Sequence, residues 1–283
     1  MNPPDLRDPS LPNEPSRLSF IAAMLFVVAG CKGGVGKSMV ALALVDYLLQ
    51  RGAPVLLIET DTANPDVWRM YAREEGVVAE TLDLDRAEGW IDLINLCDAH
   101  PERVAVINTA ARNHQGVAAH GATLYRALPE LRRWLVTFWV INTQLDSLKL
   151  LEDHLRAQTG AVTHVIRNTF FGAPDTFGLY HTLPVSEEIA RRGGQVLTLD
   201  RLADRVSGDL YSRRLSIARA VRRGGPDALP LGNRAELERW REAVAGLFDA
   251  IVPAELQGRP FQAADAGSPA DSFPAPTAET AVV

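Results

Sequence analysis

The chain has 283 residues, 47% of them hydrophobic, enough for the core of one large domain or two small ones. Its formal net charge of -6 argues against a globally basic nucleic-acid-binding protein, although it is compatible with a local basic face. The two cysteines, Cys31 and Cys97, form neither a disulfide framework nor a metal-ligand spacing, and they suit the reducing cytoplasm, where we expect the protein to act.

Both ends of the chain are polar or proline-rich and lack apolar periodicity. Residues 1–19 lack the basic start and apolar run of a secretory signal, and residues 256–283 are rich in Ala, Pro, Ser and acids. Such segments cannot repay their ordering entropy, so we expect a disordered leader and a disordered tail around one domain at residues 20–255. The apolar runs are well short of the ~20 residues that a membrane helix needs, so we expect no membrane contact.

Between these ends, short apolar runs alternate with helical patterns. Near-continuous apolar runs predict strands that are covered on both faces, at residues 24–30, 54–60, 103–110, 135–142, 163–170 and 195–200. Helical patterns lie at residues 38–52, 89–100, 121–134 and 144–160. From about residue 185 the pattern is mainly helical, and we expect these helices to cover the edge and one end of the sheet. The alternation predicts an α/β fold, a doubly wound, mostly parallel sheet flanked by helices.

A glycine-rich segment, CKGGVGKS at residues 31–38, joins the first predicted strand to the first predicted helix. In this context glycines allow a tight turn that exposes backbone N–H groups, and the helix N-terminus adds its dipole, so the segment is typical of a phosphate-binding P-loop. Lys37 is expected to contact the β- and γ-phosphates, and the Ser38 hydroxyl to bind Mg²⁺. Only three of the 29 basic residues are lysines, and two of these, Lys32 and Lys37, lie in this loop. A compact ammonium fits a phosphate cradle better than the planar fork of arginine.

The string Lys32-Gly33-Gly34-Val35-Gly36-Lys37-Ser38 resembles the deviant Walker A motif of the ParA/MinD superfamily of SIMIBI P-loop ATPases. The resemblance covers about residues 24–221 and implies that the ligand is ATP. It implies nucleotide binding by Lys32, Gly33, Gly34, Val35, Gly36, Lys37, Ser38 and Met39. It further implies that Lys32 reaches across an ATP-dependent homodimer to the partner's nucleotide and takes part in catalysis. A fortuitous glycine-rich turn is the alternative, which the surrounding strand and helix disfavour.

The second predicted strand ends in VLLIETDTANPDVW, which is similar to the acidic switch I segment of that superfamily. The resemblance implies that Asp61 orients the attacking water and that Glu59 supports Mg²⁺, with Asp61 also near the metal through water. Placement and charge dominate phosphoryl transfer, and this turn follows a strand's carboxyl end, where α/β sheets bind ligands. A turn that caps the next helix would also explain the Asp, Asn and Pro residues of the segment.

Two asparagines lie at the ends of later strands. Asn108 stands where the superfamily has an aspartate that holds the water shell of Mg²⁺. An amide can accept a hydrogen bond from metal-bound water but carries no charge, so we expect weaker Mg²⁺ binding or slower turnover. Asn168 falls where the superfamily commonly recognises adenine, and a cap on a turn would explain it equally well.

The segment from Arg191 to Arg223 contains nine arginines and three aspartates, a local excess of six positive charges. Such a patch could neutralise DNA phosphates without sequence preference. A solvated helical face in an arginine-preferring protein is the other interpretation.

Within the superfamily, ETDTANPDVWRMY and the residues at 82–111 are most similar to plasmid mobilisation and conjugation ATPases of the TraL/MobD/StbB type. The sequence therefore predicts an ATP-dependent dimerising switch in partitioning, mobilisation or conjugation. It would use ATP and Mg²⁺, hydrolyse ATP slowly and act with an unidentified protein partner. The alternatives are a nucleotide-binding adaptor with little turnover and a metabolic ligase or amidotransferase. For the latter two we find no residues that would recognise a carboxylate or amine substrate. A metal-cluster assembly ATPase would need a bridging cysteine pair, whereas Cys97 stands alone.

Overall fold

The computed structural model describes residues 21–30, 33–111, 114–157 and 161–252. The predicted leader and tail, residues 1–19 and 256–283, lie outside these ranges, as do Cys31 and Lys32.

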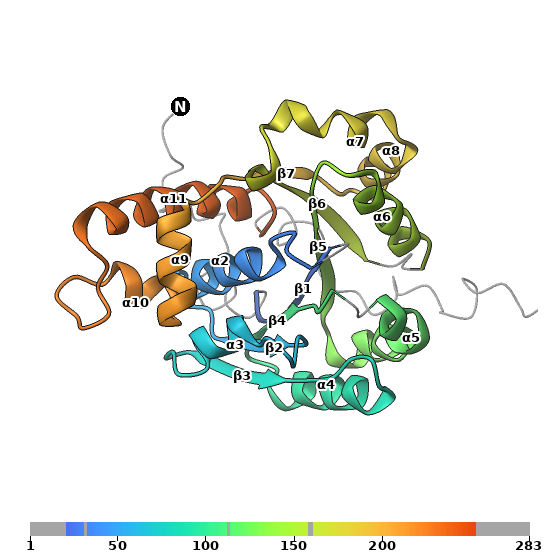
Figure 1. Cartoon of the computed structure of the whole chain (residues 1–283). Helices are drawn as coiled ribbons and strands as arrows, with labels where there is room; N and C mark the ends of the chain where they lie inside the picture. The colour runs from blue at the N-terminus through green and yellow to red at the C-terminus, as the bar shows by residue number, and fades with distance from the viewer. Residues whose placement is uncertain (1–20, 31–32, 112–113, 158–160, 253–283) are drawn as a thin grey trace, which may run out of the picture.

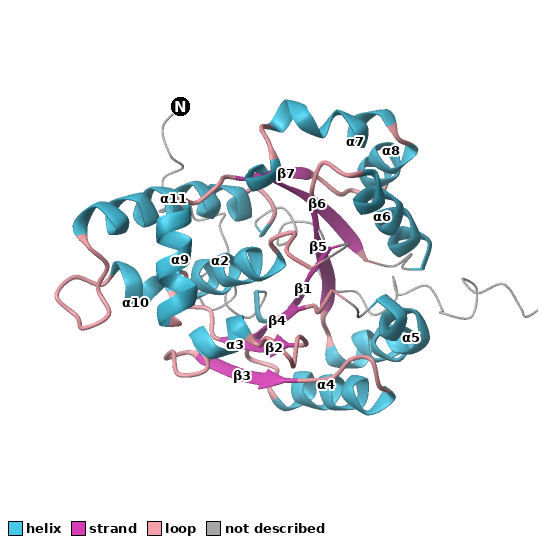
Figure 2. Ribbon diagram, in the orientation of Figure 1, coloured by secondary structure: helices cyan, strands magenta, loops and turns pink. Residues whose placement is uncertain are grey.

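A parallel sheet forms the centre of the molecule (Figures 1 and 2), and its described part has seven strands in the order β3-β2-β4-β1-β5-β6-β7. The strands are β1 (Met24–Gly30), β2 (Val55–Glu59), β3 (Val77–Thr81), β4 (Val104–Asn108), β5 (Trp134–Ile141), β6 (Val162–Asn168) and β7 (Val196–Leu199). Each pairing is parallel. The central strands are apolar along nearly their whole length because helices cover both faces. The predicted α/β fold class is confirmed.

Helices cover the two faces of the sheet as separate groups (Figure 1). One face carries α2 (Lys37–Gln50), α3 (Asp66–Tyr71), α9 (Asp204–Arg213), α10 (Ile217–Val221) and α11 (Leu231–Asp249). The other carries α4 (Ala87–Ala99), α5 (His114–Leu131), α6 (Leu145–Ala157), α7 (Gly178–Thr182) and α8 (Pro184–Arg191), with the 3₁₀ turns η1 (Thr169–Phe171) and η2 (Pro174–Phe177) after β6. No helix in the described ranges is long and apolar enough to cross a membrane.

Among the C-terminal helices, α11 contacts the edge strand β7, in line with the prediction that these helices cover an edge of the sheet. Helix α11 packs beside α2, where Arg241 makes two hydrogen bonds of 2.6 and 2.9 Å to the carboxylate of Asp46. Asp46 is 1% exposed, and burial raises the pKa of its carboxyl while the arginine opposes that effect. The ion pair therefore holds α11 beside α2, on the same face of the sheet, where Phe248 of α11 packs against Phe138 of β5.

Strand β3 is absent from the predicted elements. Its five residues are partly or fully exposed, and it pairs along one side only, with β2. A short edge strand carries no continuous apolar run, so the pattern used to find the central strands does not detect it.

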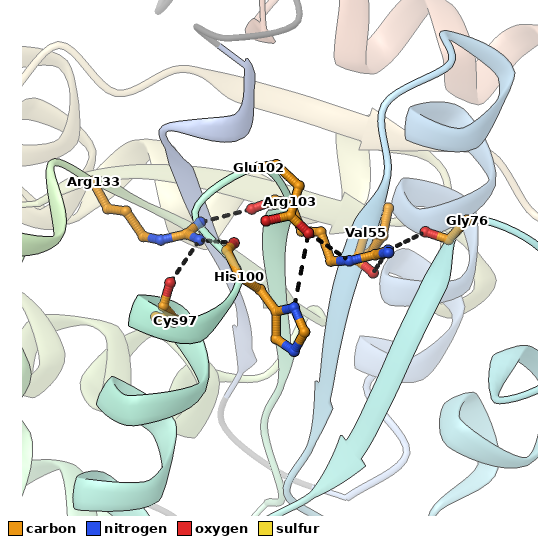
Figure 3. A network of polar contacts seen from close by, with 7 residues as sticks. All are labelled: Val55, Gly76, Cys97, His100, Glu102, Arg103 and Arg133. Atoms are coloured by element: carbon orange, nitrogen blue, oxygen red, sulfur yellow. Dashed lines mark hydrogen bonds and ion pairs between the residues drawn. The ribbon is translucent and has the colours of Figure 1, made fainter.

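Two arginines bond to backbone carbonyls at the side of the sheet where the strands have their amino ends (Figure 3). Arg133, 5% exposed, donates to the carbonyl oxygens of Cys97, His100 and Arg103 at 3.1, 2.8 and 2.8 Å. Arg103 in turn donates to the carbonyl of Gly76 at 2.9 Å. These bonds satisfy carbonyls at the end of α4 and in the adjoining loops, so this edge is sealed by polar contacts.

Candidate functional site

The carboxyl ends of β1, β2, β4 and β6 meet at the opposite edge of the sheet, because all four strands are parallel. Gly30 ends β1, and the glycine-rich loop runs from it to the first turn of α2. Gly34 and Gly36 have φ angles of 79° and 103°, which residues with a Cβ rarely adopt. Gly36 occupies the N-cap of α2, so the loop delivers the helix N-terminus to this edge.

Asn168, at the end of β6, holds the loop from one side. Its Nδ2 donates to the carbonyl oxygen of Val35 at 2.9 Å, and its Oδ1 accepts from the backbone N of Phe170 at 3.0 Å. A Cβ at Gly36 would lie 2.3 Å from that same Nδ2. Asn168 therefore caps the turn after β6, the alternative that the sequence left open, and fixes the P-loop. Its role towards adenine stays a prediction.

Glu59 and Asn108 approach the loop from the other side. They are paired directly in the register of β2 and β4. The Asn108 Nδ2 lies 3.1 and 3.0 Å from the two carboxylate oxygens of Glu59 and 3.4 Å from the Ser38 Oγ. The amide thus joins the acid of β2 to the hydroxyl at the start of α2.

Glu59 is 0% exposed, and burial raises the pKa of its carboxyl to about 7 against the lowering effect of the hydrogen bond from Asn108. The Oδ1 of Asn108, itself 2% exposed, has no hydrogen-bond partner among the described residues. An unpaired acceptor beside a carboxylate and a hydroxyl is an oxygen-rich set of the kind that Mg²⁺ and its bound waters prefer. Ser38, Glu59 and Asn108 therefore fit the predicted metal.

Asp61 begins the turn after β2. Its backbone N donates to the Glu59 Oε1 at 3.0 Å, and its Oδ1 accepts from the backbone N of Asn64 at 3.0 Å. The carboxylate thus orders the loop that leads into α3, as the turn interpretation of this segment requires. The side chain remains partly exposed beside Glu59. Its role in orienting water stays a prediction.

Thr60 is a contributor that the sequence analysis did not single out. Its Oγ1 donates to the carbonyl oxygen of Asn108 at 3.2 Å and accepts from the backbone N of Ala110 at 2.8 Å. The hydroxyl ties the turn after β2 to the turn after β4. Only knowledge that these strands are neighbours could have identified it, because 48 residues separate Thr60 from Asn108.

The remaining predicted residues of the loop begin α2. Lys37 is the first residue of the helix and is 7% exposed, and Ser38 follows it. Met39 is partly buried and packs against the core shared by α2 and β1. Gly33 has open space around its Cα. Lys32 lies outside the described residues, so its predicted contact with a partner stays a prediction.

The nine arginines of the 191–223 segment fall into two classes. Four of them form ion pairs: Arg191 and Arg192 with Glu188, Arg201 with Asp204, and Arg219 with Asp227. The other five are exposed and have no ion pair within the described residues: Arg205, Arg213, Arg214, Arg222 and Arg223. The predicted basic face is thus confined to α9 and the loops that flank α10.

Known proteins resemble this chain over most of its length. Residues 26–173 match the family described as the CobQ/CobB/MinD/ParA nucleotide binding domain. Protein MobD of Acidithiobacillus ferrooxidans is 49% identical over 232 residues, which are 82% of this chain and 99% of that protein. A cytosolic Fe-S cluster assembly factor NUBP2 homolog of Monosiga brevicollis is 32% identical over 92 residues, 32% of this chain and 29% of that protein.

Among solved structures, the MinD cell division protein of Aquifex aeolicus is 14% identical, with a TM-score of 0.48 over 85% of this chain and 99% of that one.

Proposed function

This chain belongs to the CobQ/CobB/MinD/ParA family of nucleotide-binding domains, and from that premise we propose that it is an ATP-dependent dimerising switch in plasmid mobilisation or partitioning. The likeness to Protein MobD, which extends over 99% of that protein, supports this branch of the family. The arrangement of the P-loop between Asn168 and the Glu59–Asn108 pair carries the proposal, since it holds a helix N-terminus and Lys37 at one edge of the sheet.

In the proposed mechanism, the P-loop amides and Lys37 would bind the phosphates, and the Ser38 hydroxyl would hold Mg²⁺. The metal would neutralise charge on the β- and γ-phosphates. Asn108 would accept a hydrogen bond from metal-bound water through its Oδ1, which has no partner among the described residues, and Glu59, to which Asn108 donates, would contribute negative charge that the amide lacks. Asp61 orients the attacking water from the switch loop. Because an uncharged amide stands where the resemblance expects an aspartate, we expect slow hydrolysis.

ATP binding would join two protomers, each Lys32 reaching the partner's phosphates, and hydrolysis would release them. The dimer would bind the γ-phosphate more tightly than the monomer does, and this difference in binding would shift the protein between the two states. The dimer would act in the cytoplasm and present the unpaired arginines of the 191–223 segment to DNA or to a protein partner.

A nucleotide-binding adaptor with little turnover is the second candidate, and the missing charge at Asn108 favours it. Metal-cluster assembly is disfavoured because Cys97, in α4, is 1% exposed and burial raises the pKa of its thiol.

The deciding experiment compares Lys32→Ala with Lys149→Ala, a change of the third lysine, which is exposed on α6. Light scattering would follow mass with and without ATP and Mg²⁺. We expect the wild type and Lys149→Ala to dimerise with ATP, and Lys32→Ala to bind ATP but stay monomeric. Dimerisation of Lys32→Ala to the wild-type extent would refute the mechanism. Turnover measured on the same proteins, with and without DNA, separates the switch from the adaptor.

A further inference from the structure

The order of the strands gives a direction to a nucleotide bound at the P-loop. The loop follows β1, and the residues proposed to hold the metal, Ser38, Glu59 and Asn108, meet on the side of β1 where β4 and β2 lie. The γ-phosphate and its metal would therefore face that side. The sugar and the base would leave the loop on the other side, toward the carboxyl ends of β5, β6 and β7.

An exposed aromatic side chain lies on that other side. Phe170 is the second residue after β6 and is 54% exposed. Its backbone N donates to the Asn168 Oδ1 at 3.0 Å, and the Asn168 Nδ2 donates to the carbonyl oxygen of Val35 at 2.9 Å, so two hydrogen bonds connect Phe170 to the P-loop. Among the described Phe, Tyr and Trp residues one other is exposed, Trp134, which begins β5 at the opposite edge of the sheet.

The turn that carries Phe170 is fixed by contacts with the segment after β7. The Thr169 Oγ1 donates to the carbonyl oxygen of Leu199 at 3.0 Å and accepts from the backbone N of Arg201 at 2.9 Å. The Phe170 ring contacts the Phe171 ring edge to face at 5.3 Å between centroids, and the guanidinium carbon of Arg201 lies 5.2 Å from its centroid. Phe170 remains more than half exposed despite these contacts. A ring that is already held in place loses little conformational freedom when a flat ligand covers it.

We propose that the base of the bound nucleotide stacks on the Phe170 ring. The inference rests on the proposed function, since it requires that the P-loop binds the phosphates of a nucleotide. Single exposed apolar residues are common on protein surfaces, but this ring is held in place where the base would leave the P-loop.

Stacking sets which class of base the site prefers. Every base presents a flat π face, so an aromatic ring contributes affinity without reading hydrogen-bond patterns. Purines cover more of the ring than pyrimidines do, so Phe170 favours purine nucleotides over pyrimidine nucleotides. It does not separate adenine from guanine, because that choice needs hydrogen bonds to the edge of the base, the role predicted for Asn168.

The test compares nucleotides with a ligand that has no base. Isothermal titration calorimetry measures binding of ADP, GDP, CDP and pyrophosphate to the full chain with Mg²⁺. Diphosphates are used because the proposed dimer needs the γ-phosphate, so each titration reports the site of one protomer. We expect Phe170→Ala to weaken ADP and GDP about tenfold, CDP by less and pyrophosphate by less than about twofold.

Two further variants serve as controls. Phe170→Tyr keeps the aromatic face and should bind all four ligands within about twofold of the wild type. Leu179→Ala removes another exposed apolar side chain, on α7, and should also bind as the wild type does. Thermal unfolding without ligand checks that each variant is folded. In NMR spectra of ¹³C-labelled ADP, H2 and H8 of the bound base should shift upfield with the wild type, through the ring current of Phe170, and less with Phe170→Ala.

Failure of this proposal and failure of the proposed function give different results. If the wild type binds none of the four ligands, the P-loop is not a nucleotide site and both fail. If the wild type binds ADP and Phe170→Ala binds it equally well, or weakens ADP and pyrophosphate by the same factor, the stacking proposal alone is overturned. It is also overturned if Phe170→Ala binds ADP normally but no longer dimerises with ATP, because Phe170 would then lie between the two protomers.

Discussion

Asn108 and Glu59 act as one unit at the scale of single residues. The amide hydrogens of Asn108 lie between two carboxylate oxygens that have no exposure to solvent. The amide stabilises the buried carboxylate because it donates to both of its oxygens. An aspartate at position 108 would offer no hydrogen-bond donor to Glu59. It would also add a second negative charge at the distance from the Glu59 carboxylate that the amide now has.

Asn108→Asp should therefore destabilise the nucleotide-free protein and favour metal binding. We expect the free energy of unfolding to fall by about 1 to 2 kcal/mol near neutral pH, because two buried carboxylates repel. Saturating ATP with Mg²⁺ should restore much of this loss and raise turnover above that of the wild type. Urea unfolding with and without Mg²⁺-ATP, together with a phosphate-release assay, measures both effects.

Asn142→Asp is the matched control, since Asn142 directly follows the buried strand β5 but uses its Oδ1 to accept from the backbone N of Gln144, which an aspartate can also do. Its stability should change little and should not respond to Mg²⁺. Equal stability of Asn108→Asp and wild type without nucleotide would contradict the paired arrangement.

The sequence predicted that Ser38, Glu59 and Asn108 belong to one site but not how they contact one another. The absent charge at Asn108 could be seen in the string VINTAA, because only the residue type mattered. Its bond to Glu59 could not, because it depends on β2 and β4 being neighbours while β1 lies on the other side of β4. Strand order is a property of tertiary packing that periodicity along the chain does not encode.

At the scale of elements, the P-loop and α2 form a rigid joint between strands. The loop is fixed from β6 by Asn168, and α2 is fixed from α11 by the ion pair between Asp46 and Arg241. The central strands and α2 were predictable because their apolar runs are long. The ion pair was not, since its members are 195 residues apart.

Gly36→Ala should disturb this joint more than Gly33→Ala. The added Cβ would meet the Asn168 Nδ2 at 2.3 Å, and φ at this position is 103°, whereas at Gly33 nothing lies within 4 Å. Strain and the loss of the Asn168 to Val35 hydrogen bond together should cost about 2 kcal/mol of unfolding free energy. We expect Gly33→Ala to stay within about 0.5 kcal/mol of wild type.

Urea unfolding without nucleotide measures this difference, because the loss of phosphate contacts then does not affect the free energy of unfolding. If both alanine variants were equally stable, Asn168 would not be holding the loop through Gly36.

At the scale of the whole molecule, net charge and local charge point to different partners. The chain is acidic overall, yet five of the nine arginines in the 191–223 segment have no ion pair within the described residues, and these five lie on α9 and in the loops that flank α10. The sequence indicated the basic segment but could not separate its arginines by their partners. Glu188 and Asp227 neutralise some of them, and those contacts depend on the turns and helices that the chain forms there.

Arg205→Ala combined with Arg213→Ala should weaken binding to duplex DNA more than Arg191→Ala combined with Arg201→Ala. The first pair removes cations that are free to contact phosphates, whereas the second removes cations already paired with Glu188 and Asp204. Each lost phosphate contact reduces the magnitude of the slope of log affinity against log salt concentration by about 0.9. The slope of the first double variant should therefore be shallower than that of the wild type by about 2. Fluorescence anisotropy of a labelled duplex, titrated with the ATP-bound protein at several salt concentrations, gives both slopes. Equal slopes for the two double variants and the wild type would mean that this arginine-rich segment is a solvated helical surface and that DNA, if bound, contacts another face.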